Sequence, residues 1–221
     1  MMSNLFNYDN PVWRFIGKFF DVMVLNLLWV LCSIPIVTMG ASTTAVYYVA
    51  LKLVRDENDS TVKAFFRSFK ENFKQATAIW LILLAVGFLI GFDIYFFVHM
   101  EPSTFRTVMT SVLLAFGFIW LLISLYVFPL QARFYNPIRR TIFNACFMSL
   151  RHLLRTIVML LMDGAVILLV FMVPVLFMIM VLFGFPLLAF LNSMLFVGIF
   201  DIYMPKKEPR AEDEAWELPE E

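Results

Sequence analysis

A run of 50 residues, 156–205, contains only two charged side chains. Two further runs, 76–98 and 107–132, contain one charged side chain between them. A helix needs about 20 apolar residues to cross a bilayer, and its backbone groups must bond within the helix because lipid offers no partners. These runs are longer than a buried helix of a soluble domain requires. They predict an all-α fold, a polytopic transmembrane helix bundle.

The composition of the whole chain agrees with this class. Apolar residues make up 62% and charged residues 15% of the sequence, whereas about a quarter of the residues of a soluble domain are charged. The formal net charge is zero, which argues against a nucleic-acid partner.

The apolar runs divide into six predicted helices. The N-terminal run, 19–51, is too long for one crossing, and Pro35 divides it because proline removes a helical hydrogen bond. The run 156–205 is expected to break at the Gly-Phe-Pro sequence of 184–186, and Pro174 is expected to kink its first helix. The predicted crossings are about 13–34, 36–54, 76–98, 107–131, 156–182 and 186–204.

The positive charges predict how the chain is oriented. If the N-terminus is inside, the cytoplasmic segments hold every one of the 17 Lys and Arg residues except Arg106. Cytoplasmic loops are rich in Lys and Arg. We therefore expect a multi-pass protein of the cytoplasmic membrane with both termini in the cytoplasm. Residues 1–204 form its transmembrane domain, and 205–221, with seven acidic against three basic side chains, form a disordered acidic tail.

Two other interpretations of the N-terminal region remain open. In a five-helix alternative, residues 41–54 form an interfacial helix and the N-terminus lies outside, which moves Arg14 and Lys18 outside as well. In the other, residues 1–41 are a cleaved signal peptide, although Asp9 and the long polar start argue against it.

Basic segments with regularly spaced apolar residues precede the third and fifth crossings. In 61–75 and in 138–155, apolar residues recur at steps of three and four, which places them on one helical face. Such helices lie in the headgroup plane, where each basic residue adds about 1 kcal/mol of attraction to anionic lipid. The expected apolar positions are Val62, Phe65, Phe66, Phe69 and Phe73, and Ile142, Phe143, Phe147, Leu150 and Leu154. The residues expected to contact anionic lipid or a partner protein are Lys63, Arg67, Lys70, Lys74, Arg151 and Arg155.

Four polar side chains fall within the predicted crossings, namely Asp93, Asp163, Asn26 and Asn192. An ionisable residue inside a membrane helix is by default a functional hypothesis, and together the four would line a path for a proton or a substrate. The alternative is structural. Asp93 would face the wet outer end, Asp163 would pair with a cation such as Arg155, and the two Asn side chains would hydrogen-bond between helices.

The sequence contains no motif of an enzyme. It has no GxxxxGK[ST], HExxH or GxSxG pattern. His99 and His152 lie on opposite sides of the predicted membrane, so they cannot share a metal ion or a catalytic site. Cys32 and Cys146 are expected to be free thiols. We expect no enzymatic activity, and therefore no catalytic residue, metal or cofactor.

The segment 26–42, with the pattern N-x-L-W-x-L…I-P-x-x-T-x-G-A-S, resembles the signature of the bacterial YesL-like family of membrane proteins. The segments 69–75 and 128–134 are also similar to that family, and the resemblance covers most of 5–200. The biochemical function of the family is unknown. Its members often occur beside genes for carbohydrate uptake and sensor kinases, so the resemblance implies a bacterial membrane protein associated with a sugar-transport or sensor complex. A small transporter or channel is the alternative.

Overall fold

The computed structural model describes residues 11–57 and 60–204, and no strand occurs among them. The helices are α1 (Pro11–Ser33), the short 3-10 helix η1 (Ile36–Thr38), α2 (Met39–Val54), α3 (Thr61–Val98), α4 (Thr104–Arg133), α5 (Ile138–Arg151), α6 (Leu153–Met172) and α7 (Pro174–Tyr203). Six segments are long and apolar enough to cross a membrane, namely α1, η1 with α2, α3, α4, α6 and α7. The predicted all-α class and the six apolar spans are confirmed. The predicted acidic tail, 205–221, lies outside the described residues.

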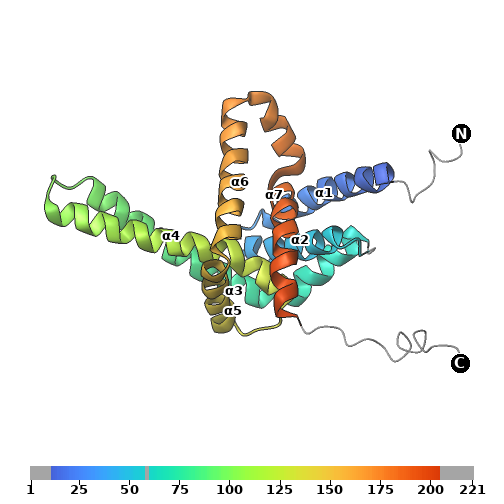
Figure 1. Cartoon of the computed structure of the whole chain (residues 1–221), viewed down its shortest axis with the longest axis horizontal. Coiled ribbons are helices and arrows are strands. Elements are labelled where there is room, and N and C mark those ends of the chain that lie inside the picture. The colour runs from blue at the N-terminus through green and yellow to red at the C-terminus, as the bar shows by residue number, and fades with distance from the viewer. Residues whose placement is uncertain (1–10, 58–59, 205–221) are drawn as a thin grey trace, which may run out of the picture.

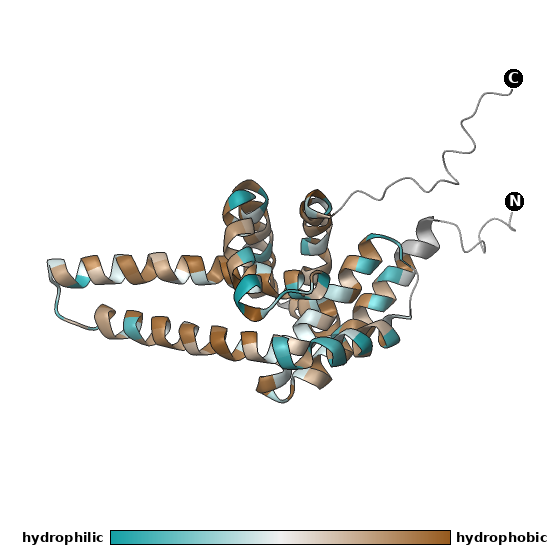
Figure 2. Cartoon of the chain, turned by 90° about the horizontal axis from the view of Figure 1, so that it is seen from below, coloured by the Kyte–Doolittle hydropathy of each residue, from teal (hydrophilic) through white to brown (hydrophobic). Residues whose placement is uncertain are grey.

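The helices form three hairpins that diverge from a shared core. The α3/α4 hairpin projects to the left in Figure 1, whereas the α6/α7 hairpin points upward and α1 and α2 extend to the right. Figure 2, turned by 90°, shows α3/α4 again from the side and the α6/α7 hairpin nearly end-on. The two long hairpins therefore share a base but not a direction.

The projecting parts of the hairpins are apolar on their outer surfaces. Figure 2 shows hydrophobic residues along the full length of the α3/α4 hairpin. Phe88 on α3 is 72% exposed, and Phe171 near the end of α6 is 79% exposed. Exposed apolar surface of this extent on a soluble protein would drive association. In lipid the same surface is solvated, which is the environment that these helices require.

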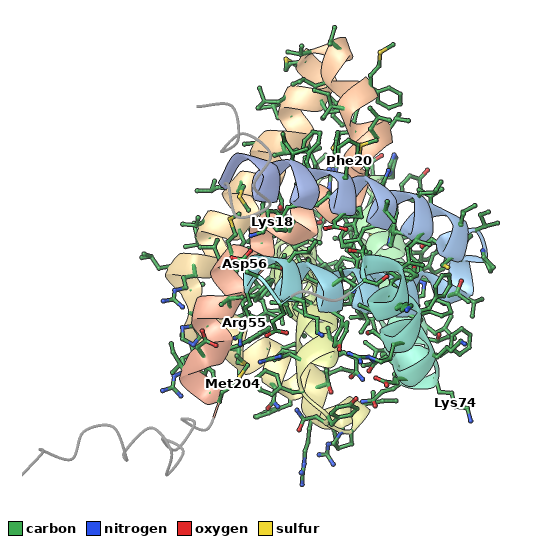
Figure 3. All side chains as sticks on the ribbon, turned by 90° about the vertical axis from the view of Figure 1, so that its right-hand side faces the viewer. Lys18, Phe20, Arg55, Asp56, Lys74 and Met204 are labelled. Atoms are coloured by element: carbon green, nitrogen blue, oxygen red, sulfur yellow. The ribbon has the colours of Figure 1, made fainter. Side chains whose placement is uncertain are left out.

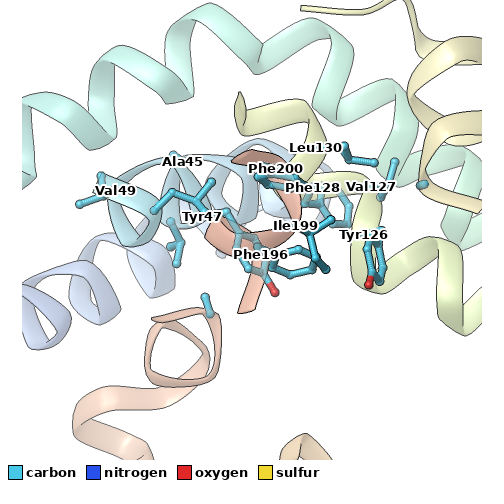
Figure 4. Close-up of a cluster of buried hydrophobic side chains, with 14 of the residues drawn as sticks. Ala45, Tyr47, Val49, Tyr126, Val127, Phe128, Leu130, Phe196, Ile199 and Phe200 are labelled. Atoms are coloured by element: carbon cyan, nitrogen blue, oxygen red, sulfur yellow. The ribbon is translucent and has the colours of Figure 1, made fainter. Parts of the chain in front are cut away.

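Helix α2 lies at the centre of the fold. Its residues from Gly40 to Tyr47 are all buried, so every side of this part of the helix is covered by other elements. The side chains from Gly40 to Ala45 are short, which lets neighbouring helices come close. Tyr47 continues this packing into an aromatic group on α4 and α7 (Figure 4), where Tyr126 and Phe196 meet edge to face at 4.9 Å. Such aromatic pairs are worth about 0.5–1.5 kcal/mol beyond burial.

A tight turn joins α1 to α2, as Pro35 predicts. The Thr38 hydroxyl lies within hydrogen-bonding distance of the Cys32 and Pro35 carbonyls, at 2.6 and 2.8 Å. The hydroxyls of Ser33 and Ser42 lie 2.6 Å apart and link the two helices. These contacts account for several positions of the 26–42 pattern, because its polar residues satisfy the backbone and each other where the chain reverses.

The segment 61–75 is not a separate helix but the first half of α3. No Gly or Pro separates it from 76–98, so the helix continues without a break. The apolar side was expected to meet the acyl boundary, and most of it is exposed, but Phe65 is buried in the protein. Ala64, Ser68 and Asn72 are buried with Phe65, whereas other predicted apolar positions stay exposed. The exposed positions are Val62, Phe66 and Phe73. Short side chains occupy the buried face of α3 because α2 packs closely against that face.

The break between the last two spans also differs from the prediction. It lies at Val173, whose extended backbone (φ −123°, ψ 96°) separates α6 from α7, and Pro174 begins α7 rather than kinking α6. Proline disfavours helical geometry in the residue before it and is favoured at a first helical position. The predicted break at 184–186 is instead a kink within α7, where Gly184 has a φ of 42°. Glycine adopts this conformation without a steric cost.

We predict that Gly40→Ala destabilises the fold. An added Cβ at position 40 would lie 2.5 Å from both the Ala76 carbonyl oxygen and the Trp80 Cβ, so α2 and α3 would have to separate. Overpacking of this kind costs about 1–3 kcal/mol. Thermal unfolding of the purified protein in detergent measures the loss. Gly91→Ala on α3 is the control, because no atom lies within 4 Å of its added Cβ; equal unfolding temperatures for the two variants would contradict the prediction.

Candidate functional site

A cavity of about 260 Å³ lies where the three hairpins converge. Helices from each hairpin contribute to it, so its shape depends on how they meet. Its polar wall comes from α2, α4, α6 and α7, and its aromatic wall comes from α1, α2, α3, α4 and α7. The lining side chains are Trp29, Met39, Thr43, Tyr47, Trp80, Ser124, Leu125, Phe128, Asp163, Phe185, Leu188 and Asn192.

Asp163 and Asn192 form the polar centre of this wall. The Asn192 Nδ2 donates to both carboxylate oxygens of Asp163, at 3.0 and 3.1 Å. Asn192 is only 2% exposed, and its Oδ1 has no hydrogen-bond partner among the described residues. The phenol of Tyr47, which is 4% exposed, lies close enough to interact electrostatically with Asp163. The half-buried Asp163 carboxylate is therefore the charged group of the cavity wall, and Asn192 holds it in place.

The aromatic wall is held in place by its own hydrogen bonds. The indole of Trp29 stacks on the ring of Phe185 with centroids 5.2 Å apart, and its Nε1 donates to the Thr43 hydroxyl at 3.2 Å. The Nε1 of Trp80 donates to the Ile36 carbonyl at 2.8 Å. Both indole N–H groups are therefore engaged within the protein. What remains for an occupant of the cavity is aromatic surface.

Two of the four polar residues predicted to form a path come together in the structure. Asp163 and Asn192 are paired, whereas Asn26 donates from Nδ2 to the Val181 carbonyl at 2.9 Å, beside the kink of α7. The Asn26 Oδ1 would be only 2.3 Å from a Cβ at Gly184, so this side chain fills the space that glycine leaves. Asp93 is exposed near the far end of α3 and does not line the cavity.

The aromatic residues of the cavity were not among the candidates predicted from the sequence. Trp29 lies in the 26–42 pattern, and Trp80 lies near the start of a long apolar run. Tryptophan is a rare residue, so both positions could have been singled out from the sequence. Tyr47 and Phe185 carry no such signal, because their neighbours in sequence are equally apolar.

A second feature is a cationic surface, called here the basic end. It is formed by the first half of α3, by α5 with the start of α6, and by the C-terminal ends of α2, α4 and α7. Lys63, Lys70 and Lys74 on α3 are exposed, and Figure 3 shows Lys74 pointing away from the helices. On α5, the guanidinium of Arg151 is exposed over the rings of Phe147 and Tyr203, at 6.0 and 5.6 Å.

The other two predicted contact residues are partly engaged within the protein. Arg67 donates to the Tyr48 hydroxyl and lies over that ring at 5.5 Å. Arg155 packs beside Gly198 of α7, and its Nη1 is buried without a hydrogen-bond partner among the described residues. It forms no ion pair with Asp163. These two arginines therefore have structural contacts that the exposed lysines lack.

Ion pairs and a buried polar chain hold the basic end together. The Lys18 Nζ on α1 lies 2.7 Å from the Asp56 carboxylate, and Arg55 pairs with Asp201 of α7 (Figure 3 labels Lys18, Arg55 and Asp56). Deeper inside, the Gln131 Nε2 donates to the Asn72 Oδ1 at 3.0 Å. Thr141 of α5 follows, donating to the Gln131 Oε1 at 3.5 Å. This chain connects α3, α4 and α5.

Two groups at this end have shifted pKa values. Burial lowers the pKa of His152, helped by the nearby positive charges of Arg155 and Arg151, and its Nε2 lies 3.0 Å from the Tyr203 hydroxyl. The carboxylate of Glu71 is the main cause of a raised pKa for the Tyr135 phenol, which is exposed. His152 lies between α5 and α6 and contacts Tyr203 of α7. Because its pKa is lowered, the observed contact between these helices favours the neutral imidazole.

We predict that the stability of the protein falls as pH decreases through the range in which His152 titrates. A histidine whose pKa is lower in the fold than its ordinary value of about 6.5 binds fewer protons there than in the unfolded chain. Its stabilising contribution is therefore complete above pH 6.5 and decreases as pH falls through the lowered pKa. Unfolding measured between pH 8 and pH 5 should show a smaller loss for His152→Gln than for the unchanged protein. Identical pH profiles would contradict this.

We predict that Gln131→Leu costs about 1–3 kcal/mol, because it leaves the buried Asn72 Oδ1 without its donor. Thermal or denaturant unfolding in detergent measures the loss. The double variant Asn72→Leu, Gln131→Leu removes both partners and should recover part of the stability. A single variant as stable as the unchanged protein would show that the chain of polar contacts does not hold α3 to α4.

Comparisons with known proteins agree with the pattern in the sequence. The family model "Protein of unknown function, DUF624" matches residues 22–94, which span most of α1, all of α2 and nearly all of α3. The chain is 29% identical over 129 residues to "Uncharacterized protein YesL" of Bacillus subtilis (strain 168), covering 57% of this chain and 60% of that protein. It is 25% identical over 154 residues to "Uncharacterized protein YteU" of the same organism, covering 67% of this chain and 68% of that protein.

No solved structure matches the chain. The family model covers the turn between α1 and α2, where the quoted pattern lies. Together these matches confirm the resemblance to YesL-like proteins that is seen in residues 26–42.

Proposed function

We propose that this protein is a non-enzymatic accessory component of carbohydrate uptake or of its regulation, which contacts lipid and a partner protein through the basic end. The observation that carries the proposal is an exposed apolar row on α5 and the start of α6. Phe143 is 69% exposed and Leu154 82%, and Phe147 and Leu150 lie between them at helical spacing. Exposed Arg139, Arg140 and Arg151 flank the row.

This arrangement suits two neighbours at once. An apolar face bordered by arginines enters the boundary between headgroups and acyl chains, and the same face can receive an amphipathic helix from a partner. The exposed lysines of α3, Lys63, Lys70 and Lys74, extend the positive surface. Near an anionic bilayer each contributes about 1 kcal/mol of attraction.

The proposed location is the bacterial cytoplasmic membrane with both termini in the cytoplasm. The distribution of Lys and Arg supports this orientation, because the basic end then faces the cytoplasm and Arg106 lies outside. A reporter enzyme fused to either end tests it. Reporter activity restricted to the outside of the cell would contradict the orientation.

The link to carbohydrate uptake rests on the resemblance to YesL-like proteins, since no side chain in the structure is specific to a sugar-transport partner. The alternative is a small transporter or channel, and the cavity lined by Asp163 and Asn192 favours it. Asp93 and Asn26 do not line that cavity, so the polar residues do not form a continuous path. A contact surface is therefore the function that the geometry supports better.

The accessory role predicts that a sugar-transport or sensor protein copurifies with the tagged protein from its host in mild detergent. Replacing Phe147, Leu150 and Arg151 by Ala, Ala and Gln should reduce recovery of that partner at least tenfold, because the exposed row is lost. A second variant set, Lys63→Gln, Lys70→Gln and Lys74→Gln, tests the contribution of α3. Arg106→Gln, at the opposite end of α3 and α4, is the matched control.

Two results would contradict this role. One is the absence of any transport or sensor protein from the purified material. The other is an unchanged amount of partner after both sets of substitutions, provided that each variant elutes as the unchanged protein does in gel filtration.

A further inference from the structure

The wall of the cavity at the base of the hairpins contains a carboxylate, Asp163, without a cation beside it. The Asp163 carboxylate accepts from Asn192, and no Lys, Arg or His in the described parts of the chain forms an ion pair with it. The Asn192 Oδ1 is buried and unpartnered. A buried polar group without a partner costs about 1–3 kcal/mol, and a carboxylate costs more. An occupant that donates hydrogen bonds would remove this cost.

The walls of the cavity have few donors to offer. The indole N–H groups of Trp29 and Trp80 are bonded to Thr43 and to the Ile36 carbonyl. The Ser124 hydroxyl donates to the Trp120 carbonyl at 2.8 Å. The Tyr47 phenol, which lies near Asp163 and Asn192, is a donor without charge. Because the carboxylate has no cation beside it, a donor that also carries positive charge complements it.

The remaining walls are suited to the rest of such a molecule. Trp29, Tyr47, Trp80, Phe128 and Phe185 line the cavity with aromatic surface. A cation near an aromatic ring gains about 0.5–2 kcal/mol, most when water is excluded. The cavity volume of about 260 Å³ is below the usual range for drug-sized ligands. It therefore fits a molecule with few heavy atoms.

We propose that this cavity binds a small organic cation, a protonated primary amine. Its ammonium group donates to the Asp163 carboxylate, which Asn192 holds in place, and its hydrocarbon part lies among the aromatic rings. A sugar is a poorer fit, because it carries no positive charge to complement the Asp163 carboxylate. The proposal rests on the cavity alone and is independent of the accessory role at the basic end.

Thermal unfolding of the detergent-purified chain tests the proposal, with n-butylammonium chloride as the probe. The expected result is a saturable rise in the unfolding temperature that n-butanol, glucose and sodium chloride at matched concentration and ionic strength do not produce. Quenching or enhancement of tryptophan fluorescence gives a second readout, because Trp29 and Trp80 line the cavity. An equal effect of n-butanol, an effect of glucose alone, or no effect of the amine would each overturn the proposal.

Substitutions then locate the site. Asp163→Asn should weaken the apparent affinity for n-butylammonium at least tenfold, and Asn192→Leu should weaken it less. Glu101→Gln removes an exposed acid in the turn between α3 and α4 and should leave the affinity unchanged. Equal affinity in Asp163→Asn and the unchanged protein would overturn the assignment. The comparison of amine with alcohol uses the unchanged protein, so it decides the question even if a variant fails to fold.

Discussion

The close approach of α2 to α3 at Gly40 is the contact on which the rest of this fold depends. A Cβ at this position would collide with the Ala76 carbonyl and with Trp80, so the approach is available only to glycine. It sets the α1–α2 turn against the middle of α3, where the Trp80 indole donates to the Ile36 carbonyl. The same contact places the wall residues of α1, α2 and α3 around one cavity.

Several polar groups in the apolar interior are paired across helices. The chain from Asn72 through Gln131 to Thr141 and the pair of Tyr126 with Thr156 at 2.7 Å satisfy each other across helices. Unpaired polar atoms in low-dielectric surroundings are costly. The unpartnered Asn192 Oδ1 stands in a cavity wall next to a carboxylate that lacks a cation. Thr77, Thr110, Arg155 and Ser193 also have a buried polar atom without a partner among the described residues, so the lone carboxylate in the cavity wall is the feature that points to a ligand.

The spans could be predicted well from the sequence, because whether a helix can cross lipid depends on the length and hydrophobicity of that segment alone. The predicted 13–34 and 107–131 agree with α1 and α4 within a few residues. The long run 156–205 was divided at the wrong place, since a proline can kink a helix or begin one and only packing decides which. The cavity could not be predicted either. Asp163 and Asn192 were recognised as unusual. Their pairing and the aromatic wall are tertiary contacts, which the periodicity of a sequence does not predict.

The shape of the cavity depends on the angle between the two long hairpins. Membrane helices tilt by about 0–40° from the bilayer normal, and the α3/α4 and α6/α7 hairpins diverge by much more than neighbouring parallel spans do (Figures 1 and 2). For both to cross one flat bilayer they must turn toward each other at their shared base. The cavity lies at that base, and its walls include Trp80 and Phe128 from one hairpin and Asp163 and Asn192 from the other. Any change in the angle between the hairpins therefore changes the cavity, and an occupant that contacts both walls favours one angle over others.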